Sequence, residues 1–114
     1  MRCAEGRTFR GLTGCVRWSG SNLICSLNGS TAVPGHPGGD QRVDVELLVY
    51  RTVPSQYTRL IATRTGWVHT NSPFNRTITN VSKVSGAHIT CDFRLLNSVN
   101  GSLIETITTP PLYH

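Results

Sequence analysis

The 114-residue chain has few charged residues, a single lysine and no long apolar run. Asp, Glu, Lys and Arg together make up 15% of it, and apolar residues make up 38%. A disordered segment is typically more highly charged than this, and a membrane-spanning helix needs about 18 or more consecutive apolar residues. The composition therefore excludes both classes and predicts one folded domain over residues 1–114.

The first residues, Met1 to Gly6, lack the apolar stretch of a signal peptide. We therefore expect either a cytosolic protein or the mature part of a longer secreted precursor. In the second case, contact with a membrane would come only through an anchor outside this segment.

Ten arginines and one lysine against six acidic residues give a net charge of +5. A basic balance favours an acidic partner, such as nucleic acid, a glycosaminoglycan or a negative protein surface. The arginines are scattered from Arg2 to Arg94, and no three basic residues are consecutive. A basic, solvated surface is therefore the simpler interpretation.

The four cysteines, Cys3, Cys15, Cys25 and Cys91, form no C-x-x-C pair. The usual zinc-ribbon and thiol-redox signatures are therefore absent. An even number of cysteines in a short chain favours disulfides, and four cysteines allow three connectivities.

Asn-x-Ser/Thr triplets mark candidate glycosylation sites at Asn28, Asn75, Asn80 and Asn100. Together with the cysteines they favour an oxidising, extracellular setting. We expect a secreted glycoprotein or the ectodomain of a membrane protein.

The apolar residues alternate with polar ones and show no helical period. Residues 23–27, 43–49 and 87–95 alternate clearly, and a further strand is predicted after the Asn100-Gly101 hairpin turn. The Gly- and Pro-rich segment 28–41 is predicted to be a loop. This pattern is typical of an all-β sandwich or barrel, with an N-terminal segment over residues 1–20 and the sandwich core over 20–108.

Cys25 and Cys91 both lie on the inward side of a predicted strand, and such a pair can bridge the two sheets of a sandwich. The bond would close a loop of about 67 residues and stabilise the fold by roughly 4 kcal/mol. Cys3 and Cys15 could pair with each other and fix the N-terminal segment. Alternatively, one of them is a free thiol or links to a partner chain.

The segment from Ile78 to Cys91 resembles the strand that holds the second cysteine of immunoglobulin superfamily domains. In that family, two apolar residues three positions apart precede Asp-x-Gly-x-Tyr-x-Cys. This spacing is kept by Ile78, Val81 and Cys91. The Asp, Gly and Tyr places of the family are taken by Ser85, Ala87 and Ile89.

Asn22 to Leu27 is similar to the first-cysteine strand of the family, and Val49 to Gln56 to the Trp-Tyr-Arg-x-x-Pro segment of variable-type domains. Val49 stands in the place of the core tryptophan. The resemblance covers about residues 20–108. It implies a two-sheet immunoglobulin-like β-sandwich with an inter-sheet disulfide, and binding of another protein in cell-surface recognition or immune signalling.

We expect the partner to contact outward apolar and aromatic residues and the loop over residues 97–101. The candidate contact residues are Leu48, Tyr50, Arg51, Tyr57, Arg59, Asn97 and Val99.

No histidine lies in a hydrolase motif, and the cysteine spacing matches no common zinc site. We therefore expect no catalysis, no metal and no cofactor.

Two alternatives stay open. The first domain of a cytokine receptor is suggested by Cys15 to Trp18 and would contain a Cys15–Cys25 bond. An intracellular, basic, OB-like nucleic-acid binder would use aromatic and basic residues on one sheet face, namely Arg51, Tyr57, Arg59, Arg64 and Trp67.

Overall fold

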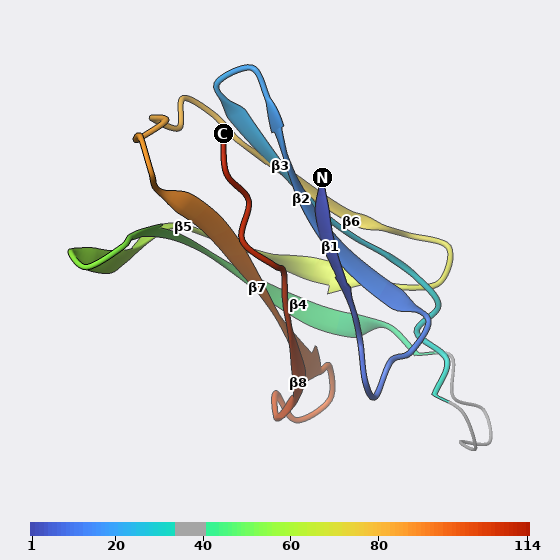
Figure 1. Cartoon of the computed structure of the whole chain (residues 1–114). Helices are drawn as coiled ribbons and strands as arrows, with labels where there is room; N and C mark the ends of the chain where they lie inside the picture. The colour runs from blue at the N-terminus through green and yellow to red at the C-terminus, as the bar shows by residue number, and fades with distance from the viewer. Residues whose placement is uncertain (34–40) are drawn as a thin grey trace.

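The computed structural model describes residues 1–33 and 41–114, so residues 34–40 of the predicted loop lie outside the described part. Within these ranges the chain forms eight strands and no helix (Figure 1). No element there could therefore cross a membrane as a helix. The strands are β1 (Arg2–Glu5), β2 (Leu12–Ser19), β3 (Asn22–Gly29), β4 (Val43–Val53), β5 (Tyr57–Val68), β6 (Phe74–Ile78), β7 (His88–Asn97) and β8 (Leu103–Thr108).

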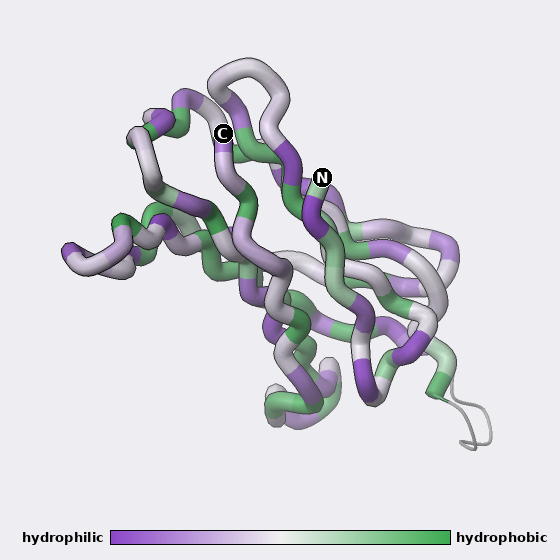
Figure 2. The backbone as a smooth tube through the Cα atoms, in the orientation of Figure 1, coloured by the Kyte–Doolittle hydropathy of each residue, from purple (hydrophilic) through white to green (hydrophobic). Residues whose placement is uncertain are grey.

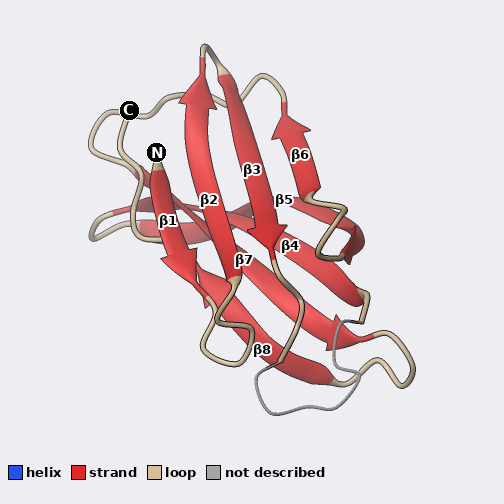
Figure 3. Ribbon diagram, turned by 90° about the vertical axis from the view of Figure 1, so that its right-hand side faces the viewer, coloured by secondary structure: helices blue, strands red, loops and turns tan. Residues whose placement is uncertain are grey.

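The strands form two four-stranded antiparallel sheets that pack face to face (Figures 1 and 3). The first sheet has the order β1-β2-β3-β6, and the second has the order β5-β4-β7-β8. The predicted all-β, two-sheet sandwich is confirmed. The architecture is compatible with an immunoglobulin-like fold.

The core lies between the inner faces of the sheets and is built by alternation. In β4 the odd-numbered residues from Val43 to Val49 are buried, and in β7 the odd-numbered residues from Ile89 to Leu95 are buried opposite β3. Successive side chains of a strand point to opposite faces, so one apolar set fills the core while the other faces solvent. Figure 2 shows this alternation of apolar and polar residues along the strands.

Four strands were not apparent from the sequence at their full length, and one of them, β6, was not predicted as a strand. β1 and β2 lie within the segment that the sequence assigned to the N terminus, and β5 extends far beyond its short apolar stretch, Leu60 to Ala62. β2 presents Gly14 to the core, where a Cβ atom would lie 2.7 Å from the ring of Phe93. A glycine at an inward position weakens the apolar alternation, although close packing requires it here.

One disulfide joins Cys3 of β1 to Cys15 of β2, at directly opposed positions on the outer side of the first sheet. The predicted inter-sheet disulfide is not formed. Cys25 and Cys91 are buried free thiols whose sulfur atoms face each other across the sandwich at 3.4 Å, whereas bonded sulfurs lie about 2.05 Å apart. The hydrogen bond between the two thiols, together with burial, raises the pKa of the Cys91 thiol.

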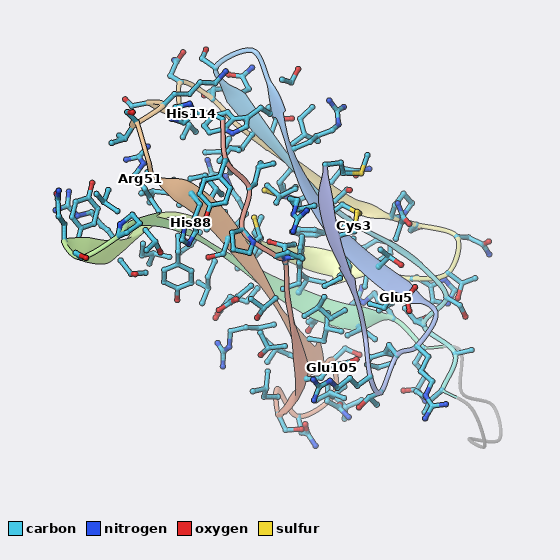
Figure 4. The ribbon with its side chains drawn as sticks, in the orientation of Figure 1. Cys3, Glu5, Arg51, His88, Glu105 and His114 are labelled. Atoms are coloured by element: carbon cyan, nitrogen blue, oxygen red, sulfur yellow. A yellow bond between two sulfur atoms is a disulfide. The ribbon has the colours of Figure 1, made fainter. Side chains whose placement is uncertain are left out.

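Glu105 of β8 links the second sheet to the turn between β1 and β2 (Figure 4). Its Oε2 accepts hydrogen bonds from the backbone N–H groups of Arg7 at 2.9 Å and Thr8 at 3.3 Å. Its Oε1 accepts one from the N–H of Phe9 at 2.8 Å. Hydrogen bonds to a charged acceptor are stronger than neutral ones, so this carboxylate holds the β1–β2 turn against β8.

We predict that Glu105→Gln lowers the free energy of unfolding by about 1–3 kcal/mol, because an amide carries N–H groups where the turn offers only donors. Urea unfolding of the variant, with the exposed neighbour change Thr106→Ser as control, measures this difference. Equal unfolding midpoints for the two variants would contradict the role of Glu105.

We also predict that oxidation joins Cys25 to Cys91 and stabilises the chain by roughly 4 kcal/mol, through the loop entropy of the unfolded state. The double variant Cys3→Ser/Cys15→Ser isolates this pair, and its unfolding is measured with and without a reductant. If the reductant changes nothing and both thiols react with a maleimide after unfolding, the two cysteines stay reduced.

Candidate interaction face

The outer face of the second sheet consists of the side chains of β5, β4, β7 and β8 that point away from the core. In β4 these are the even-numbered residues from Asp44 to Tyr50, which alternate with the buried set. The strand register places outward side chains of the neighbouring strands beside them. The neighbouring residues are Leu60, Thr63, Thr65 and Trp67 of β5, Asp92, Arg94 and Leu96 of β7, and Leu103, Thr106 and Thr108 of β8.

Large apolar side chains are exposed on this face. Leu60 is 47% exposed, Trp67 44% and Leu103 50%. The predicted contact residues Leu48 and Tyr50 lie between them, half-buried. Large apolar groups that remain in contact with solvent on one sheet face are typical of protein interaction sites.

The same face carries most of the acidic charge that the structure describes. Asp44, Glu46 and Asp92 lie on it with Arg94 beside them and Arg42 over the Trp67 ring, so acidic groups outnumber basic ones there in a chain of net charge +5. Arg94 forms an ion pair with Glu46, and Asp92 accepts a hydrogen bond from the hydroxyl of Thr108 at 2.8 Å. Asp44 has no such partner among the described residues, so its charge is available to a ligand.

The predicted contact residues Arg51, Tyr57 and Arg59 do not share a face with Leu48 and Tyr50. Arg51 follows Tyr50 directly, so its side chain points to the other side of the strand, and its Nη2 donates to the carbonyl oxygen of Ser82 at 2.7 Å (Figure 4). Arg59 pairs with Arg51 in the register, and its guanidinium lies 4.5 Å from the centre of the Tyr57 ring. These three residues therefore face away from Leu48 and Tyr50.

Asn97 is the last residue of β7, and Val99 lies in the turn between β7 and β8, at one end of the sandwich. The Oδ1 of Asn97 accepts hydrogen bonds from the N–H groups of Val99 at 2.8 Å and Asn100 at 3.3 Å, and Val99 is 90% exposed. A cavity of about 240 Å³, which no sequence pattern indicated, opens at this end. Its lining includes Phe9, Thr31, Val43, Leu96, Asn97 and Ile104.

All four candidate glycosylation asparagines are exposed, and none lies on the strands of the second sheet. Asn28 and Asn75 point outward from β3 and β6 of the first sheet. Asn80 follows β6, where its N–H donates to the Oδ1 of Asn22 at 3.2 Å. Asn100 lies in the β7–β8 turn. Any glycans would therefore gather mainly on the first sheet.

The C-terminal residues cover part of β7 that the alternation of side chains alone would leave exposed to solvent. Leu112 exchanges two backbone hydrogen bonds with Ile89, and the Tyr113 ring packs edge-on against His88 at 5.4 Å. The Nδ1 of His88 is buried without a hydrogen-bond partner in the described part of the chain. Across residues 1–33 and 41–114, no three His, Cys, Asp or Glu side chains come together in a group that could hold a metal ion.

The cytokine-receptor alternative loses the disulfide that it requires. Cys15 points to the outer side of the first sheet and is bonded to Cys3, while Cys25 points into the core, so a Cys15–Cys25 bond does not form. Trp67 lies on the acidic outer face, whereas Arg51 and Arg59 lie on the opposite side of the same hairpin. Of the five residues predicted for a nucleic-acid site, Arg51, Tyr57, Arg59 and Arg64 therefore lie on one side of the hairpin, and Trp67 lies on the other.

Comparisons with known proteins add no information to the geometry. No family model matches the chain, and no curated protein and no solved structure matches it.

Proposed function

We propose that this protein is an extracellular, immunoglobulin-like domain that binds another protein through the outer face of the second sheet. The observation that carries the proposal is the contrast between the two sheets. One outer face combines exposed Leu60, Trp67 and Leu103 with carboxylates, and the other bears Asn28 and Asn75. A glycan shields the surface around its attachment site, so the second sheet is the face left open to a partner.

The strand order supports the immunoglobulin-like part of the proposal. The strand of the first cysteine, β3, pairs with β6, the strand before the one that holds the second cysteine. In the second sheet, β5 lies beside β4 at the sheet edge. Variable-type domains have an additional strand at the corresponding edge. Val49 and Cys91 are neighbours in the register, so Val49 occupies the core position where the family has tryptophan.

The chemistry of the face specifies the partner further. The apolar groups supply buried area, and the carboxylates of Asp44 and Asp92 are able to pair with cations. The partner is therefore a protein whose contact surface is basic where it meets the central strands β4 and β7 and apolar where it meets the edge strands β5 and β8. By resemblance to the immunoglobulin superfamily, such binding belongs to cell-surface recognition or immune signalling, and it involves no catalysis.

The proposal predicts that fluorescent tetramers of the domain stain cells that display the partner, and that Leu60→Ser/Trp67→Ser weakens the staining about tenfold or more. Truncating apolar anchors at an interface typically costs more than about 1 kcal/mol each. The matched control is Ile24→Ser, which replaces a half-buried apolar residue on the outer face of the first sheet. Loss of staining with Ile24→Ser but not with the double variant would place the binding site on the first sheet and contradict the proposal.

A further inference from the structure

A second surface, of opposite charge, lies on the far side of the β4–β5 hairpin, which extends beyond the first sheet (Figure 1). The register pairs Arg51 with Arg59, and Leu47, whose side chain points inward, with Arg64. The side chains of Arg51, Arg59 and Arg64 therefore project from the side of the hairpin opposite to the acidic outer face. Arg59 and Arg64 are exposed, and Arg51 is half-buried.

Arg76 of β6 extends this group. Its Nη2 donates to the carbonyl oxygen of Thr65 at 3.0 Å, and a Cβ atom on Gly66 would lie 2.4 Å from the same nitrogen. Gly66 is two residues from Arg64 and faces the same side of β5. We call Arg51, Arg59, Arg64 and Arg76 the arginine stripe.

The stripe has no internal compensation for its charge. Arg51 and Arg59 are directly opposed across two strands, and like charges in that position destabilise a sheet. The ion pair found within residues 1–33 and 41–114 joins Arg94 to Glu46 on the other face. Glu105 is held by the β1–β2 turn. An anion bound along the stripe would relieve this repulsion.

The dimensions favour a linear polyanion. β-Strands rise about 3.3 Å per residue, so the Cα atoms of Arg59 and Arg64 lie roughly 15 Å apart along β5. A single phosphate or carboxylate would contact both residues only if both side chains bent toward each other along β5, whereas a chain that carries a charge on each of its units meets each arginine separately.

The aromatic residues decide between two kinds of polyanion. Single-stranded nucleic acid binds by stacking its bases on open aromatic rings. Beside the stripe, the guanidinium of Arg59 lies over one face of the Tyr57 ring, and Trp67 lies on the opposite side of the hairpin with Arg42 over its ring at 5.4 Å. A polysaccharide with sulfate groups needs only the cations. The Cys3–Cys15 disulfide and the exposed glycosylation asparagines also fit the extracellular setting in which such chains occur.

We propose that the arginine stripe binds a linear sulfated polysaccharide. This surface is distinct from the outer face of the second sheet, and the two ligands differ in charge. The domain can therefore hold an anionic chain on one side of the β4–β5 hairpin while the other side faces a protein.

The test measures binding of a size-defined heparin oligosaccharide to the full chain by surface plasmon resonance at about 150 mM salt, where long-range attraction is screened. Arg59→Gln/Arg64→Gln should lower the affinity about tenfold or more and make it less dependent on salt, because fewer charges are neutralised. The matched control is Arg10→Gln/Arg17→Gln, which removes the same charge from exposed residues of the β1–β2 turn and β2. All four changed residues are exposed, and thermal unfolding verifies that the variants fold.

Three results would overturn the proposal. The first is an equal loss of affinity in both double variants, which would indicate that net charge alone causes binding. The second is no binding by the unchanged chain. The third is equally tight binding of a single-stranded DNA of matched charge through the same arginines. The variant Leu60→Ser/Trp67→Ser should bind the oligosaccharide as the unchanged chain does. Failure of the protein-binding face and failure of the stripe are therefore separately visible.

Discussion

The structure depends on the packing of two inner sheet faces, with the Cys25 and Cys91 sulfur atoms in contact where β3 meets β7. Both cysteines are completely buried, and the apolar residues of β3, β4 and β7 surround them. Because the side chains of a strand alternate with a period of two, burying one set fixes the other on the surface. A slip of one residue in β4 would bury Asp44 and Glu46 and expose the valines. The core therefore determines which residues form the candidate binding surfaces.

Charge is divided among the surfaces that result. The outer face of the second sheet carries acidic groups on its central strands and exposed leucine and tryptophan on its edge strands. The arginine stripe lies on the other side of the same hairpin, and the first sheet is polar and carries two of the glycosylation sequences. A uniform basic surface, which net charge alone suggests, would show no such division. Opposite charges on two sides of one strand pair favour partners of different chemistry at each side.

The sequence predicts which side chains of a strand point inward wherever the strand is central and one of its faces is fully buried. The inward sets of β3, β4 and β7 were predicted correctly, as was the outward position of Leu48 and Tyr50. The grouping of Arg51 with Tyr50 failed because adjacent residues point to opposite sides. β5 was hard to detect because it is an edge strand and its hairpin extends past the first sheet, so little of it alternates. Whether Cys25 and Cys91 are bonded could not be predicted, because the alternation of side chains places the two thiols near each other without showing that a disulfide forms.

Glycan placement tests the division between the two sheets most directly. Peptide mapping by mass spectrometry, on protein secreted from mammalian cells and kept unreduced, reports each asparagine and the Cys3–Cys15 link together. The account predicts glycans on Asn28, Asn75 and Asn80 of secreted protein, with Cys3 bonded to Cys15. Bare asparagines and free thiols at Cys3 and Cys15 would contradict it, because neither an extracellular setting nor a shielded first sheet would then remain.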